Sequence, residues 1–150
     1  SLREPPPRSP RHQSLDMSLT SLMESNTHTN LKTPANHWDW DSVPVEELGG
    51  GVSRQMIVGE RLMVCRLHFA PNVVTQAHDH PHEQITLVER GRVRFIIGSE
   101  ERIAQAGDVL HFPSGCWHGA TMLDEEVVLI DIFTPLREDF LKKNLNGGNL

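Results

Sequence analysis

The sequence feature that most constrains the fold is a succession of short apolar and β-branched runs that begins after the Gly49-Gly50-Gly51 triplet. Turn residues such as Gly107-Asp108 separate the runs, and Val93, Phe95 and Ile97 alternate with other side chains within one of them. Many short strands joined by regular turns are typical of a β-sandwich or barrel. We therefore predict an all-β domain with strands at residues 53–58, 61–69, 84–90, 92–97, 102–105, 109–112, 117–122 and 126–133.

The residues outside this series carry different signals. Residues 1–36 contain Pro5-Pro6-Pro7 and only scattered apolar side chains, so they cannot bury enough surface to offset their ordering entropy. We expect this segment to be disordered or extended, and we expect residues 144–150 to fray. The sequence thus predicts a single domain over residues 37–143.

Two stretches near the ends of the predicted domain are not strands. Residues 137–143 have the pattern of a short terminal helix, with Phe140 and Leu141 docked inward. At the other end, Trp38 and Trp40 come shortly before the first strand. We expect these two tryptophans to pack as a cap on one end of the core, because packing is the commonest use of such side chains.

Composition narrows the possible partners and compartments. A formal net charge of −6 gives no electrostatic footprint for nucleic acid or an anionic membrane, which leaves small polar molecules as ligands. Cys65 and Cys116 are too few for a disulfide scaffold, and we interpret both as packing residues in a reducing compartment. The chain has no membrane-span or secretory-signal pattern, so we expect a cytoplasmic protein.

Residues 53–58 could offer an edge strand to a second copy, and a homodimer is expected.

Side chains that can bind a metal gather in two stretches. His78, His80 and Gln84 lie at even spacings at the start of one strand-like run, and Gly91 closes it. In an extended segment, alternation places these three side chains on one face. The second stretch, residues 107–118, ends at His118. Three imidazoles and one amide are therefore available for one divalent transition metal, namely zinc, nickel, iron or manganese. The alternative is that the histidines only hydrogen-bond within a polar barrel mouth.

Two further histidines are not assigned to the metal. His82 shares the spacing of the ligands, but Pro81 breaks the extended run, and a fifth ligand would fill a position that the site needs to keep open. We interpret His82 as a residue of the mouth or as an exposed side chain. His111 alternates with Val109 and could hydrogen-bond a ligand or face solvent.

The last predicted strand carries a carboxylate among apolar residues. Asp131 shares one face with Val127, Leu129 and Phe133, and burial there would raise its pKa toward the range useful for proton transfer. Arg137 follows near the same end, and its guanidinium suits bidentate capture of a carboxylate substrate. Alternatively, Asp131 and Arg137 pair with each other, or Arg137 only opens the helix.

The two ligand-bearing stretches resemble the two sequence motifs of the cupins. The first motif is matched by His78, His80, Gln84 and Gly91, and the second by Gly107, Pro113, Gly115 and His118. Met122 stands where the second motif commonly has Asn, and Gln84 stands where the first commonly has Glu. The resemblance implies a cupin barrel, which is a double-stranded β-helix or jelly roll, with a short C-terminal helix and a metal site.

A narrower resemblance covers residues 45–141. The runs 78–84 and 131–140 are similar to those of the pectin-degradation cupins, which linearise 4,5-unsaturated monouronates. This resemblance implies that the metal is held by His78, His80, Gln84 and His118. It also implies that a carboxylate-bearing sugar is surrounded by the catalytic residues Asp131, Phe133 and Arg137.

The sequence leaves three functions open. Four neutral ligands leave the metal its full positive charge, and such a Lewis acid suits uronate linearisation with Asp131 as the proton donor. The same imidazoles would also suit a mononuclear iron cupin dioxygenase. A non-catalytic cupin that binds a metal or a sugar acid is the third possibility.

Overall fold

The structure is a computed structural model that describes residues 34–142. The chain divides into two units, residues 1–37 and 38–150. Residues 34–37, the described part of the first unit, contain no helix or strand. The expected disorder of residues 1–33 and fraying of residues 144–150 lie outside the described residues. Within residues 34–142, no helix is long and apolar enough to cross a membrane.

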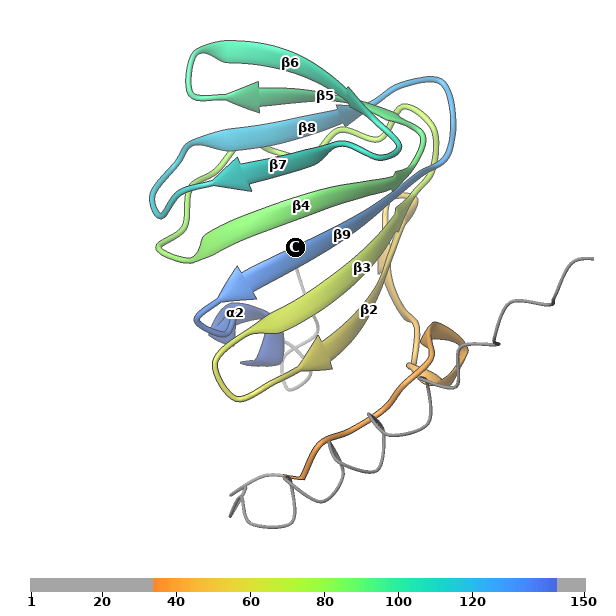
Figure 1. The fold of residues 1–150 in the computed structure, drawn as a ribbon. Helices are drawn as coiled ribbons and strands as arrows, with labels where there is room; N and C mark the ends of the chain where they lie inside the picture. The colour runs from red at the N-terminus through yellow and green to blue at the C-terminus, as the bar shows by residue number, and fades with distance from the viewer. Residues whose placement is uncertain (1–33, 143–150) are drawn as a thin grey trace, which may run out of the picture. The chain divides into compact units, whose positions relative to one another are not determined.

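The second unit is built from two antiparallel sheets (Figure 1). The larger sheet has the strand order β1 (Glu46–Gly49), β2 (Val52–Val58), β3 (Met63–Phe69), β9 (Val127–Thr134), β4 (Glu83–Arg90) and β7 (Val109–Phe112). The smaller sheet has the order β6 (Glu100–Gln105), β5 (Arg92–Ile97) and β8 (His118–Met122). A 3₁₀-helix, η1 (Trp40–Ser42), precedes the sheets, and a single turn of α-helix, α2 (Glu138–Lys142), follows β9. The prediction of an all-β domain with a short terminal helix is confirmed.

Alternating burial along the strands places the core on their inner faces. In β3 every second residue from Met63 to Phe69 is buried, and in β5 Val93 and Phe95 are buried while Arg92 and Arg94 are exposed. The buried side chains of both sheets form one apolar cluster. Because side chains alternate across a strand, each strand offers this core only one row of residues.

The turn between β4 and β5 requires its glycine. Gly91 has φ +83°, and a Cβ there would lie 2.5 Å from the carbonyl oxygen of Glu126. Only glycine combines this left-handed conformation with so close an approach of backbone. The turn passes the chain from the larger sheet to the smaller one, so Gly91 joins the two halves of the domain.

Several features of the fold differ from those predicted from the sequence. Strand β1 was not predicted, and it pairs with Val52, Ser53 and Arg54 of β2. Of the predicted edge strand, residues 53–58, only the first two residues are therefore covered by β1, and the homodimer stays a prediction. Leu141 is 37% exposed, so of the two helix residues only Phe140 packs inward. Trp38 is 48% exposed and does not cap the core, because it lies on the outer surface over β2.

Candidate metal centre

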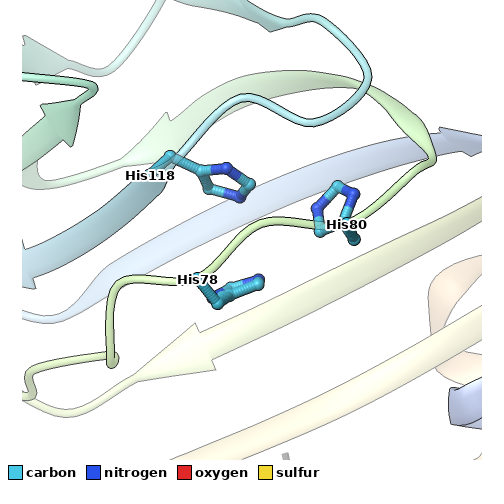
Figure 2. Close-up of side chains that lie close together, drawn as sticks. All are labelled: His78, His80 and His118. Carbon is cyan, nitrogen blue, oxygen red and sulfur yellow. The ribbon is translucent and has the colours of Figure 1, made fainter.

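Three histidines from the two ligand-bearing stretches come together inside the domain. His78 and His80 lie in the segment before β4, and His118 is the first residue of β8. Figure 2 shows the three rings turned toward a common point, and one potential ligand atom from each lies within 4.8 Å of the others. His80 and His118 are buried, whereas His78 is exposed. The cluster therefore has one side toward solvent, as a site that admits a substrate requires.

Backbone pairing brings the two stretches into register. His78 and His118 form an isolated antiparallel bridge, with N–H to O=C hydrogen bonds of 2.9 Å in both directions. Directly opposed residues of an antiparallel pair project to the same face, which is why their rings meet. Next to this bridge, a Cβ on Gly119 would lie 3.0 Å from the Cα of Ala77. Gly119 thus allows the close approach that holds the bridge together.

The ring nitrogens are oriented by backbone carbonyls. In each of the three rings, Nδ1 lies within hydrogen-bond distance of a backbone carbonyl oxygen. The pairs are His78 with Gln76 at 3.0 Å, His80 with His82 at 2.9 Å, and His118 with Cys116 at 2.8 Å. A carbonyl only accepts, so each Nδ1 carries the proton, and in the neutral ring each Nε2 then keeps a free lone pair. A metal-binding imidazole adopts this tautomer when its other ring N–H donates to a backbone carbonyl.

Burial also keeps two of the rings neutral. The pKa of His80 is lowered to about 4, first by desolvation and then by the nearby positive charge of Arg137. Desolvation likewise lowers the pKa of His118. Both rings are therefore uncharged at neutral pH, and their lone pairs are available to a cation without competition from protons.

Gln84 presents its amide oxygen to the same cluster. Gln84 is the second residue of β4 and is buried, and its Oε1 lies 3.0 Å from Nε2 of His80. Neither atom carries a proton in the tautomer above, so two acceptors face each other. Two ligand atoms about 2.1 Å from one ion would be about 3.0 Å apart in octahedral and about 3.4 Å apart in tetrahedral coordination. This donor set fits a divalent transition metal better than it fits a network of hydrogen bonds alone.

Asp131 lies on β9 beside the predicted fourth ligand. In the pairing of β4 with β9, Thr86 opposes Asp131, and its hydroxyl donates to Oδ1 of Asp131 at 2.6 Å. Desolvation raises the pKa of Asp131 to about 6, although the hydrogen bond from Thr86 and the nearby amide of Gln84 act in the opposite direction. A carboxyl with this pKa can exchange a proton near neutral pH.

Aromatic side chains and Arg137 form the wall next to the cluster. Phe133 is buried and lies edge-on to His80, with 5.8 Å between the ring centroids. The guanidinium of Arg137 lies over Phe133 at 5.0 Å and over Phe140 at 4.0 Å. Its Nε and Nη2 bind the carboxylate of Asp139 at 3.0 and 2.7 Å. The structure therefore pairs Arg137 with Asp139, and not with Asp131 as the alternative from the sequence had it.

The two histidines left out of the predicted ligand set are not members of the cluster, although the ring centroid of His82 lies 5.5 Å from that of His80. His82 is half-buried, with its Nε2 3.1 Å from the backbone oxygen of Leu136 and its own carbonyl orienting His80. His111 is on the outer face of β7, where it pairs with Glu83 at 2.9 Å. His111 thus faces solvent, and His82 supports a neighbouring ring.

The comparisons with known proteins agree with this geometry. A family model described as Cupin domain matches residues 65–133. The pectin degradation protein KdgF of Dickeya dadantii is 40% identical over 104 residues, which are 67% of this chain and 94% of that protein. The chain is a cupin.

Solved structures of cupins show the same fold. KdgF from Halomonas sp. superposes with a TM-score of 0.68 at 26% identity, covering 71% of this cupin and 99% of that chain. An RmlC-like cupin from Shewanella frigidimarina gives a TM-score of 0.66 at 30% identity, covering 71% of this cupin and 96% of that chain. The cupin fold and a histidine triad able to bind a metal ion are therefore established for this chain.

Proposed function

We propose that this cupin opens 4,5-unsaturated monouronates to linear keto-uronates at a metal held by His78, His80, His118 and Gln84. Similarity to two KdgF proteins, one of which is named for pectin degradation, supports the substrate class. The observation that carries the proposal is the position of Asp131, whose carboxyl has a raised pKa and connects through Thr86 to the fourth ligand. In this proposal, a proton donor on β9 lies beside the fourth ligand of a Lewis-acid site.

The metal would supply a fixed positive charge that holds and stabilises substrate oxygens, since all four of its protein ligands are neutral. The residues of the chain do the rest. We assign Phe133 to the sugar ring and Arg137 to its carboxylate, because Phe133 lies against His80 and the guanidinium of Arg137 lies over Phe133. Because Nε and Nη2 of Arg137 already bind Asp139, the substrate carboxylate would use the remaining N–H groups or displace Asp139.

Asp131 moves the proton. Its carboxyl transfers a proton to C4 of the C4=C5 enol ether, and water adds at C5 while its proton returns to the Asp131 carboxylate. The product is a hemiketal, and its C5–O bond breaks as the C5 hydroxyl proton moves to the ring oxygen. The ring oxygen stays on C1, which then carries two hydroxyl groups and releases one water as it becomes the aldehyde. The net change is therefore an isomerisation that opens the ring. Thr86 holds Oδ1 of Asp131, so Oδ2 is the oxygen that carries the proton.

The test compares the wild type with Asp131→Asn after both are loaded with the same metal. Asn keeps an oxygen that can accept from Thr86 but carries no transferable proton, so we expect unchanged metal content and a loss of turnover of about 10²–10⁴-fold. Turnover is followed by the disappearance of the ultraviolet absorbance of the unsaturated uronate. Retained turnover in the variant would show that Asp131 is structural.

Two controls separate the other cupin functions. His80→Ala should lose the metal and the activity together, as measured by elemental analysis of protein purified without an affinity-metal column. Uronate binding without turnover in the metal-loaded wild type would favour a binding module. Iron in the purified protein, with oxygen consumption on an electron-rich substrate, would favour a dioxygenase.

A further inference from the structure

A chain of hydrogen bonds links Asp131 to the amide of Gln84. The hydroxyl of Thr86 lies 2.6 Å from Oδ1 of Asp131, and Nε2 of Gln84 lies 2.8 Å from the oxygen of that hydroxyl. The other end of the amide, Oε1, lies 3.0 Å from Nε2 of His80. Thr86 is fully buried, at 0% exposed, so solvent does not compete for its hydroxyl.

The direction of this chain follows from the chemistry of its members. A carboxylate only accepts, so the single hydroxyl proton of Thr86 is donated to Asp131. The hydroxyl oxygen then has only lone pairs left for its second neighbour, and it must accept from an N–H of Gln84. The amide is thereby turned so that its oxygen, and not its nitrogen, faces the histidine cluster.

The geometry points to Thr86 and Asp131 as positioning residues that orient the amide of Gln84 for the metal. This inference rests on the proposed metal site and extends it to a residue that touches neither metal nor substrate. An amide has one end that binds a cation and one that repels it, and the flipped amide would direct N–H groups at the ion. If the amide could adopt both orientations, part of the free energy of metal binding would be spent on selecting the one that binds. Fixing the orientation in advance avoids this cost.

The same contacts explain why the fourth ligand is an amide. A glutamate at position 84 would offer Thr86 a second carboxylate, and the single hydroxyl proton cannot serve both acceptors. It would also bring a second negative charge close to Asp131. Glutamine satisfies Thr86 with a donor at one end and faces His80 with an acceptor at the other, so Thr86 and Asp131 select glutamine at this position.

The test measures metal affinity directly, without turnover. Thr86→Val removes the hydroxyl at nearly constant size, and Thr86→Ser keeps it. Zn²⁺ and Co²⁺ are titrated into each metal-free protein against a chromogenic chelator. Loss of an outer-sphere hydrogen bond to a ligand typically costs 10–100-fold in metal affinity, so we expect a Thr86→Val loss of about that size and near wild-type affinity for Thr86→Ser.

A matched control removes a hydroxyl that lies outside the chain. Thr134→Val deletes a hydroxyl that donates to the backbone oxygen of Arg61 at the end of β9. This variant should bind Zn²⁺ as the wild type does. Equal losses in Thr134→Val and Thr86→Val would assign the effect to general destabilisation and overturn the inference.

A second measurement is independent of how well the single variant folds. The carboxylate of Gln84→Glu has two equivalent oxygens and no orientation to fix, so adding Thr86→Val to it should cost no further affinity. The side-chain amide of Gln84, observed by nuclear magnetic resonance in the metal-free protein, should lose protection from hydrogen exchange in Thr86→Val. An equal loss of affinity in both backgrounds, or an unchanged amide, would overturn the inference.

These outcomes are separate from those that test the proposed function. A metal-loaded wild type that does not open uronates refutes the proposed activity, while the Thr86→Val affinity loss still reports on the positioning of Gln84. Conversely, Thr86→Val with wild-type affinity for Zn²⁺ refutes the positioning role even if the enzyme is active. A wild type that binds neither ion refutes both.

Discussion

Acidification should reveal two opposed titrations in the metal-free protein. The pKa of His80 is about 4 in the folded chain against 6.5 in an unfolded one, so the unfolded chain binds this proton more tightly and acid destabilises the fold. Between pH 7.5 and pH 5 this difference removes about 2 kcal/mol from the free energy of unfolding. The lowered pKa of His118 acts in the same direction.

Asp131 acts against the histidines over the same range. Its pKa is about 6 when folded against 3.8 when unfolded, so the folded chain binds this proton more tightly, and its contribution to stability is lost as the pH rises through 6. Between pH 7.5 and pH 5 its protonation therefore returns about 1–2 kcal/mol. The wild type should show a shallow decline in stability because the two contributions partly cancel.

Asp131→Asn removes only the stabilising titration. We expect its free energy of unfolding to fall by about 1–2 kcal/mol more than that of the wild type between pH 7.5 and pH 5. Urea unfolding of both proteins in excess chelator measures the difference, and the remaining titratable groups cancel between the two curves. Parallel curves would refute the raised pKa of Asp131 and, with it, its suitability as a proton donor near neutral pH.

Three further predictions concern groups around the site. Glu46→Ala removes the carboxylate that lies 3.2 Å from the buried guanidinium of Arg54, and it should lower the free energy of unfolding by about 1–3 kcal/mol. Arg54→Met should cost less in the same urea assay, because it leaves no unpaired charge in the core. Gly119→Ala places a methyl group 3.0 Å from Ala77 and should cost about 1–3 kcal/mol and weaken Zn²⁺ binding. Cys65, whose pKa burial raises to about 12, should react with thiol reagents at pH 8 only in denaturant, as mass spectrometry would show.

Much of the fold follows from local sequence patterns. Alternation and turn residues located eight of the strands to within about two residues, which is the ordinary uncertainty of element ends. Strand β1 was not predicted because Glu46, Glu47 and Gly49 carry no alternating apolar signal, and β2 is its only partner among the strands of residues 34–142. Leu141 was misplaced because neighbouring residues of an α-helix project about 100° apart, so Leu141 does not share the inward face of Phe140.

The candidate site shows the limit of local patterns more clearly. Even spacing put His78 and His80 on one face, and the resemblance to the two cupin motifs added His118, which the backbone bridge to His78 places beside them. The roles of Thr86 and Asp139 depend on what faces them. Alternation alone places Thr86 on the same face as Gln84, but only the cross-strand register of β4 with β9 sets it opposite Asp131. The proton of one hydroxyl then decides which end of the Gln84 amide faces His80, and no property of residues 84–86 taken alone contains that information.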